Sequence, residues 1–428
     1  MKKLMAMLLS LLCAVALCAC ENPARSYTVS FETNGGSAIE SLSYTEGDKL
    51  TVADPERDGW HFAGWYTDES LSAAWDGKTI SDDTTLYAAW GENKNGIFQV
   101  AGEMYWFDED GGKIKGEYSF YPAGDTESET IYYFNVTGGE GLKYSYHHVT
   151  GNLWYIQDPA ECVCWLIRGE KKALMVDTGA GVGSTGKLLE LILGDFPYEV
   201  ALTHYHHDHS GGTYSLPMGT PIYLGKEDIY GLDCRSGEGL DSVERRYSYF
   251  TTENPKNHTP CSYDDFSPGR RLENLIGVQT GDSVDIGGNS VQFFTIHSHS
   301  QGSLGILFTN ERLLVIGDGL NSNTQNMFED SAPVETFLAS LRELKGYEDR
   351  WDGILPSHIT TSVQNKDMLD RTIEVCEAIV AKGSWEGEKE GPRGGWVCSN
   401  GHGGLTYRKD NIFEEQHGYL KVPEDYER

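Results

Sequence analysis

Between residues 151 and 410, short apolar runs alternate with stretches whose apolar residues recur at helical spacing. The runs predict buried strands at 162–167, 173–176, 198–203, 305–308 and 313–316, and a hairpin at 276–296 around Gly287–Asn289. The stripes predict a helix at 188–192, one that begins at Pro333 and buries Val334, Phe337, Leu338, Leu341 and Leu344, and one from 369 to 380 that ends before Gly383. Strands that feed helices throughout predict a layered α/β architecture.

The chain before residue 151 has a different pattern, with many aromatic residues and little helical periodicity. Residues 27–92 predict a small all-β module with a strand at Val29–Phe31, a turn at Asn34–Gly36 that tolerates positive φ, an aromatic stretch at 59–68 and a closing strand at 84–90. Most of these aromatic side chains are expected to pack in the core of the module.

Residues 93–150 are predicted to add β-structure that connects this module to the rest of the chain. Within them, residues 104–112 predict two strands around a tight turn. Asp108–Gly111 also resembles the start of a calcium-binding loop. That loop needs a later glutamate where this chain has Ser119, so we interpret Asp108–Gly111 as a turn.

Residues 1–19 resemble a bacterial lipoprotein signal peptide. Lys2–Lys3 gives a basic start, and the apolar run from Leu4 to Leu17 is too short to predict a membrane span. Leu17–Cys20 resembles a lipobox, which implies cleavage before Cys20, lipidation of its thiol, and an exported protein anchored to the bacterial cell membrane. The alternative is an ordinary secretory signal with an incidental cysteine, which also implies export.

Thr203–Gly212 concentrates metal-binding side chains in the order His-x-His-x-Asp-His. Because this segment follows a predicted strand, we expect it on a loop at the strand's end, where Gly211–Gly212 allows a tight turn into a helix. Neutral imidazoles and a carboxylate at this density suit zinc or a similar transition metal. The alternative, a solvated loop that is His-rich by chance, is less favoured because the rest of the chain supplies further ligands.

The order of these residues resembles the signature of the metallo-β-lactamase superfamily, and the resemblance extends over residues 151–404. The other motifs of the family occur in sequence at Leu174–Gly179, His299–Ser303, Leu314–Asp318 and Ile354–His358. The family often has Pro-Gly just before the third histidine, whereas this chain has Ile296–Ser298 there. His297 is therefore a rival to His299, although Gly302–Ser303 favours His299.

This resemblance implies a four-layered αββα fold in which two sheets face each other, helices lie outside, and two Zn²⁺ or other divalent transition-metal ions lie at one edge. The ligands it implies are His204, His206 and His299 for one ion, Asp208, His209 and His358 for the other, and Asp318 as the bridge. It also implies that Asp177 orients ligands from behind. Such a centre provides hydroxide for hydrolysis at neutral pH, and Asp208 would orient it and accept its proton.

Residues 27–92 resemble the Listeria–Bacteroides repeat, a small β-grasp-like module of bacterial surface proteins. Asn34–Gly36, Gly64–Tyr66 and Leu86–Trp90 carry the match. It implies a spacer, or a contact with the cell surface or cell wall. The expected division of the chain is a signal peptide at 1–19, the repeat at 27–92, a connecting segment at 93–150, a catalytic domain at 151–410 and a tail at 411–428.

The formal net charge of −31 constrains the partners. A phosphodiester backbone would be repelled and no Lys/Arg-rich groove is visible, so we expect a small-molecule substrate and no nucleic acid. Cys162 and Cys164 flank one residue of a predicted strand and are expected to be buried thiols on the same face. Cys234 and Cys261 could form a disulfide in an exported protein, which the sequence leaves open.

The substrate class follows from the aspartate at position 318. This ligand is the pattern of glyoxalase II-like hydrolases and favours an acyl ester, a thioester or a lactone. The alternatives are a β-lactamase, although those usually have cysteine or serine there, and a sulfate or phosphoester hydrolase. A further alternative is an iron redox centre of the flavodiiron type. Such centres usually have glutamate where this chain has His206, so the motif favours hydrolysis. A cell-surface adhesion or recognition protein with an inactive hydrolase domain would have no need of all seven ligands.

Two residues near the ligands, Tyr205 and Asn321, are expected either to touch a substrate or simply to pack. The insert at 231–274 and the Gly-rich segment at 384–404 are expected to frame the pocket.

Overall fold

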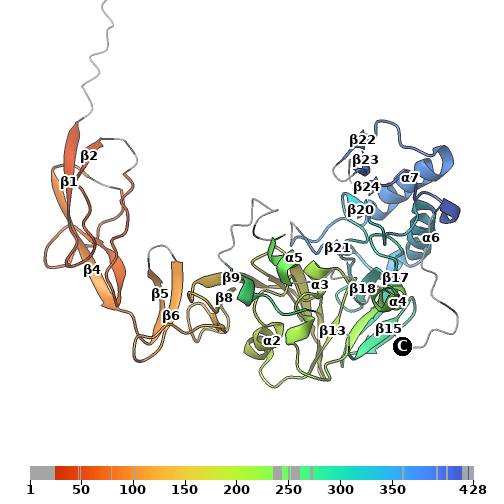
Figure 1. Cartoon of the computed structure of the whole chain (residues 1–428), viewed down its shortest axis with the longest axis horizontal. Coiled ribbons are helices and arrows are strands. Elements are labelled where there is room, and N and C mark those ends of the chain that lie inside the picture. Colours follow the sequence, from red (N-terminus) through yellow and green to blue (C-terminus); the bar gives the residue numbers. More distant parts are fainter. Residues whose placement is uncertain are drawn as a thin grey trace, which may run out of the picture. The chain divides into compact units, whose positions relative to one another are not determined.

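The structure, a computed structural model, describes residues 25–46, 48, 50–78, 80–100, 103–234, 243–248, 251, 261–269, 273–358, 361–391, 394–401, 403–416 and 423. Contacts divide the chain into two compact units, Met1–Lys113 and Ile114–Arg428 (Figure 1). The expected signal peptide and Cys20 lie outside the described residues. Within the described ranges, no helix is both long enough and apolar enough to cross a membrane.

The first unit is built on a four-stranded sheet in the order β2-β1-β4-β3, in which β1 and β4 are parallel and the other pairs antiparallel. Its strands are β1 (Ser26–Glu32), β2 (Leu42–Thr45), β3 (Trp60–Tyr66) and β4 (Thr84–Glu92). Val29 and Trp65 are buried in its core, and Phe62 packs edge-on against Trp65 with ring centroids 5.2 Å apart. The predicted turn is present, with Asn34 at φ 49° and Gly35 at φ 92°.

A two-stranded hairpin completes this unit, formed by β5 (Gly96–Val100) and β6 (Glu103–Phe107). The turn predicted after β6 is present, because the Asp108 carboxylate accepts a hydrogen bond from the backbone N–H of Gly112 at 2.7 Å. The second strand predicted around that turn is not: within the described residues, the chain after the turn forms only an isolated bridge at Lys113.

A nine-stranded mixed sheet forms one layer of the second unit, in the order β15-β14-β13-β12-β11-β10-β9-β8-β7. Its strands are β7 (Glu117–Phe120), β8 (Thr130–Phe134), β9 (Gly141–Thr150), β10 (Leu153–Gln157), β11 (Val163–Arg168), β12 (Ala173–Val176), β13 (Tyr198–Ala201), β14 (Ile222–Gly225) and β15 (Leu275–Val278). Strands β7 to β12 are antiparallel, and β12 to β15 are parallel. The segment 93–150 is therefore shared: β5 and β6 belong to the first unit, and β7 to β9 extend this sheet.

A five-stranded sheet forms the facing layer, in the order β16-β17-β18-β19-β21, and a smaller sheet has the order β20-β24-β23-β22. The bounds are β16 (Ser283–Asp285), β17 (Ser290–Thr295), β18 (Leu304–Phe308), β19 (Leu313–Val315), β20 (Thr324–Asn326), β21 (Gly353–Leu355), β22 (Lys389–Glu390), β23 (Trp396–Ser399) and β24 (Gly404–Tyr407). The hairpin predicted over 276–296 is only partly correct. Within this range, only β16 and β17 pair as a hairpin. β15 joins the nine-stranded sheet instead, because a turn with Gly281 at φ 97° separates β15 from β16.

The side chains of β11 are buried on both faces and show how the layers are assembled. Trp165 lies in the core between the two sheets together with Phe293 of β17. Cys162 and Cys164 lie in the core on the opposite face, as the period-two alternation predicts. Both thiols are free. The Cys261 thiol is also free, whereas the side chain of Cys234 lies outside the described part of the chain.

Helices cover the outer faces of the two sheets (Figure 1). In the described part of the chain, the α-helices are α2 (Thr185–Leu193), α3 (His207–Ser210), α4 (Lys226–Cys234), α5 (Val243–Ser248), α6 (Val334–Lys345) and α7 (Asp367–Lys382), and 3-10 helices lie at Thr213–Ser215, Tyr263–Asp265, Glu348–Arg350 and Glu414–Gln416. α6 begins after Pro333 and buries its predicted stripe, and α7 ends at Gly383 with φ 74°. With α2 on one sheet and α6 and α7 on the other, the expected four-layered αββα fold is confirmed.

Candidate metal centre

The seven predicted ligands lie just beyond the ends of strands in the two facing sheets. They are His204 and His206 after β13, Asp208 and His209 on α3, His299 after β17, Asp318 after β19 and His358 after β21. The strands hold the starts of these loops rigidly, so residues distant in sequence converge. Their ligand atoms form two groups, and within each group all of these atoms lie within 4.8 Å of one another.

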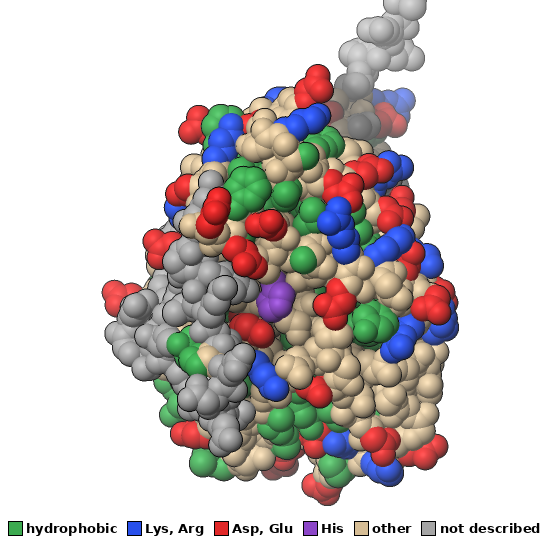
Figure 2. Space-filling view, turned by 90° about the vertical axis from the view of Figure 1, so that its right-hand side faces the viewer, with side chains coloured by type: hydrophobic (Ala, Val, Ile, Leu, Met, Phe, Trp, Pro, Cys, Tyr) green, Lys and Arg blue, Asp and Glu red, His purple; other side chains and the backbone are tan. Residues whose placement is uncertain are grey.

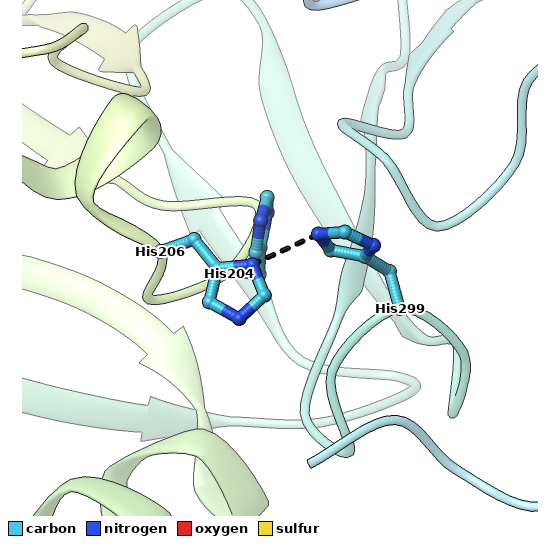
Figure 3. Close-up of side chains that lie close together, drawn as sticks. All are labelled: His204, His206 and His299. Carbon is cyan, nitrogen blue, oxygen red and sulfur yellow. Dashed lines mark hydrogen bonds between the residues drawn. The ribbon is translucent and has the colours of Figure 1, made fainter. Parts of the chain in front are cut away.

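The first group consists of His204, His206 and His299. Figure 3 shows the three imidazole rings close together, with a contact of 2.8 Å between His206 Nδ1 and His299 Nε2. The His204 ring lies nearly perpendicular to each of the other two, at 80° and 89°. Three nitrogen atoms from two loops therefore face one small volume.

The second group consists of Asp208, His209, Asp318 and His358. His358 Nε2 lies 3.0 Å from His209 Nε2 and 3.4 Å from an oxygen of Asp208. Asp318 Oδ2 lies 3.6 Å from His209 Nε2 and 3.5 Å from His358 Nε2. The same oxygen lies 3.6 Å from His299 Nε2 of the first group. Asp318 is thus situated between the two groups.

Asp177 lies behind the second group, where the sequence predicted an orienting residue. Its side chain is 1% exposed and accepts a hydrogen bond from His209 Nδ1 at 2.8 Å. It also accepts hydrogen bonds from the Thr203 backbone N–H at 2.7 Å and from the Thr203 hydroxyl at 2.9 Å. These bonds leave His209 Nε2 directed at the other members of the group.

Two contacts behind the first group come from residues that the sequence reasoning missed. His299 Nδ1 donates to the backbone carbonyl of Gln325 at 2.7 Å, and His206 Nε2 lies 3.0 Å from an oxygen of Asp330. The only sequence signal is an aspartate shortly after the Asp318 motif, and that is too common to identify an orienting residue.

The charged members of the second group shift one another's pKa. Burial alone would raise the pKa of Asp208 and Asp318, but His209 and His358 outweigh it and hold both well below the usual range. Burial opposes protonation of His209, yet the carboxylates of Asp177 and Asp208 raise its pKa to about 10. Both carboxylates are therefore ionised at neutral pH and can act as ligands.

The donor set fits divalent cations. His204 Nε2 is buried and has no hydrogen-bond partner among the described residues, which costs free energy unless a ligand takes its lone pair. Burial lowers the pKa of His204 well below its usual value and that of His299 to about 4, so both rings are neutral at pH 7. Neutral imidazoles together with ionised carboxylates are the donors of zinc sites.

The centre is partly open to solvent at both groups, and the side chain of His206 in the first group is 20% exposed. The side chains of His358 and Asp208 are 29% and 21% exposed, whereas that of His209 is 1% exposed. Figure 2 shows one face of the molecule on which a histidine lies between acidic side chains. Solvent therefore reaches the centre past His358, Asp208 and His206.

Other predicted neighbours of the site have different surroundings. His297 belongs to neither group and its Nδ1 contacts the Gln301 carbonyl at 2.6 Å, so the structure brings His299 rather than His297 to the centre. Tyr205 is buried and its hydroxyl donates to Asp330, which corresponds to the packing alternative. Asn321 accepts a hydrogen bond from the Asn323 backbone N–H at 2.8 Å. Much of the insert at 231–274 lies outside the described residues.

Comparison with known proteins gives two family matches. Residues 27–89 match the Listeria-Bacteroides repeat domain, and residues 158–358 match the Metallo-beta-lactamase superfamily. A Gly-rich membrane protein of Evansella cellulosilytica is 44% identical over 94 residues, which cover 21% of this chain and 10% of that protein. The chain thus spans about a tenth of the length of this relative. The acyl-coenzyme A thioesterase MBLAC2 of Homo sapiens is 22% identical over 218 residues, 46% of this chain and 72% of that protein.

Solved structures are also similar, at low identity. The sec-alkylsulfatase Pisa1 from Pseudomonas sp. has 15% identity and a TM-score of 0.43, over 56% of this chain and 44% of that one. The DIM-1 metallo-beta-lactamase has 13% identity and a TM-score of 0.40, over 55% of this chain and 97% of that one. These similarities carry no conclusion about activity. From the family matches, this chain carries a metallo-β-lactamase superfamily domain at residues 158–358 and a Listeria-Bacteroides repeat at residues 27–89.

Proposed function

We propose that this protein is a binuclear metal-dependent hydrolase that cleaves an acyl ester, a thioester or a lactone. The observation that carries the proposal is the position of Asp318, whose Oδ2 lies 3.6 Å from His299 Nε2 in the first group and 3.6 Å from His209 Nε2 in the second. A binuclear site needs one carboxylate that can reach both cations, and Asp318 lies within reach of both groups.

The seven side chains of the two groups would each have a role in this reaction. His204, His206 and His299 would hold one cation, Asp208, His209 and His358 the other, and Asp318 both. When bound, two divalent cations supply Lewis acidity, which makes hydroxide available near neutral pH and polarises a carbonyl. Asp208 is partly exposed, and His209 and His358 hold the pKa of its carboxyl well below the usual range. Its carboxylate is therefore ionised at neutral pH and can accept a hydrogen bond from the attacking water and orient it.

Three observations favour an acyl substrate. Position 318 is an aspartate, as in glyoxalase II-like hydrolases, rather than the cysteine or serine usual in β-lactamases. A relative that covers the same domain is named as an acyl-coenzyme A thioesterase. The formal net charge of −31 opposes binding of a phosphodiester backbone.

The test is a panel of substrates for the purified, zinc-loaded full chain: a thioester, an ester, a lactone, a β-lactam, a sulfate ester and a phosphodiester. We expect about two zinc ions per chain. We also expect the fastest turnover for the ester, the thioester or the lactone, and loss of activity on chelation. His204→Ala should lose zinc and activity, whereas His297→Ala, a histidine of the same region outside both groups, should keep them. Fastest cleavage of a β-lactam, sulfate ester or phosphodiester would refute the substrate class, and a chain without bound metal would refute the mechanism.

We further propose that the enzyme acts outside the cytoplasm, anchored to the bacterial cell membrane through a lipid on Cys20. The lipobox-like Leu17–Cys20 supports this, and a relative of the repeat is named as a membrane protein. The repeat would then act as a spacer or contact the cell surface.

A further inference from the structure

The end of β20 and the loop that follows it, residues 325–332, contact two of the three histidines of the first group and are here called the 325–332 loop. The Gln325 carbonyl accepts a hydrogen bond from His299 Nδ1 at 2.7 Å, and the Ser331 hydroxyl donates to the His299 carbonyl at 2.8 Å. The Phe328 ring meets the His299 ring edge-on, with centroids 5.0 Å apart. The loop therefore lies against the face of the first group away from Asp318.

Asp330 is the residue of this loop whose carboxylate pairs with an imidazole nitrogen of His206, while the Phe328 ring meets the same imidazole edge-on with centroids 5.7 Å apart. One oxygen of its buried carboxylate lies 3.0 Å from His206 Nε2, and the same oxygen accepts a hydrogen bond from the Tyr205 hydroxyl. The other nitrogen of the ring, His206 Nδ1, lies 2.8 Å from His299 Nε2 and faces the centre of the group.

This geometry decides which nitrogen of His206 can bind a cation. A carboxylate beside Nε2 favours the tautomer that carries its proton there, so the lone pair lies on Nδ1. Without Asp330, Nε2–H would lose this acceptor, and the ring could exchange tautomers or rotate. The Tyr205 hydroxyl holds the carboxylate in place, and Tyr205 is itself buried.

We propose that Asp330 is the positioning residue of the first group: through His206 Nε2 it directs Nδ1 to the cation, with Tyr205 as its support. This inference rests on the proposed function, because it assumes that the first group binds a metal. Asp177 holds the corresponding place in the second group, through His209 Nδ1. The two carboxylates serve different histidines, so their loss should weaken different cations.

The experiment measures zinc stoichiometry and affinity by competition with a chromogenic chelator. The proteins are the full chain and its Asp330→Asn, Asp330→Ala and Tyr205→Phe variants. We expect one of the two zinc ions to bind 10- to 100-fold more weakly in Asp330→Ala, roughly the cost of losing such a partner, while the other is unchanged. Asp330→Asn and Tyr205→Phe should show smaller losses at the same ion. Asp177→Asn should weaken the other ion instead.

Asp265→Asn is the matched control, because Asp265 is also buried but accepts its hydrogen bonds from Tyr133, Val136 and Ser262, not from a ligand. It should keep both zinc affinities. Folding is checked by circular dichroism, and if Asp330→Ala does not fold, the same comparison is made with Asp330→Asn and Tyr205→Phe. Folded variants that bind two zinc ions as tightly as the parent protein would overturn the inference and leave the proposed function intact. A parent protein that binds no zinc would overturn both.

Discussion

Asp177→Ala should destabilise the metal-free protein strongly. The Asp177 carboxylate, the Thr203 backbone N–H and the His209 ring are buried, each residue being 1% exposed. The carboxylate accepts from that N–H at 2.7 Å and from His209 Nδ1 at 2.8 Å. Alanine would leave both donors without this acceptor, and an unsatisfied buried group costs about 1–3 kcal/mol. The expected loss is therefore about 2–6 kcal/mol, a large share of the roughly 5–15 kcal/mol that holds a typical domain folded.

The assay is urea-induced unfolding followed by tryptophan fluorescence, with chelator present so that no metal contributes. Asp177→Asn keeps one acceptor oxygen and should lose less than Asp177→Ala. Asp285→Ala is the control. Asp285 is exposed, forms an ion pair with Lys171 and accepts one hydrogen bond from the Gly287 backbone N–H, so its loss should move the transition much less than the loss of Asp177. An unchanged unfolding midpoint for Asp177→Ala would show that water or the Thr203 hydroxyl replaces the carboxylate, and the reasoning would fail.

Two other predictions concern the core and the N-terminus. Leu341→Ala removes a fully buried side chain of α6, so it should lower the free energy of unfolding by about 2–5 kcal/mol in the same urea assay, while the exposed Glu343→Ala should change it little. Cys20→Ala should release the protein from membranes, because the acyl chains that we propose on Cys20 would be its anchor. Sedimentation of the variant with the membrane fraction would contradict the lipid anchor.

The local patterns of the sequence predicted much of the second unit. Five apolar positions from Val334 to Leu344 recur at helical spacing, and α6 buries all of them. β11 is apolar from Val163 to Ile167, because one of its faces packs against the other sheet and the opposite face lies in the core beneath the outer helices. Such patterns indicate which faces of a helix or strand are buried, because the burial of apolar side chains is the main source of stability for both α6 and β11.

The strand pairings were not readable in the same way. Ile276 and Phe293 belong to equally β-prone runs, yet β15 pairs with β14 in one sheet and β17 pairs with β16 and β18 in the other. The residues of a strand predict that it pairs with other strands, but they do not predict which strands these are. For the same reason the sequence did not reveal that β7 to β9 continue the nine-stranded sheet.

At the candidate metal centre, the sequence by itself determined the types of ligand and their places beyond strand ends. Each ligand motif is a short run of residues that directly follows a strand pattern. The family resemblance already implied that Asp318 bridges the two groups, and its Oδ2 lies 3.6 Å from a nitrogen of each. Only the tertiary structure decided that Asp330 contacts His206. Metal ligands form a recognisable pattern because the cation requires particular donor atoms. An orienting carboxylate needs only to end within about 3 Å of a ring nitrogen, roughly the length of a hydrogen bond. Any part of the chain can satisfy that requirement, so its position is fixed by folding alone.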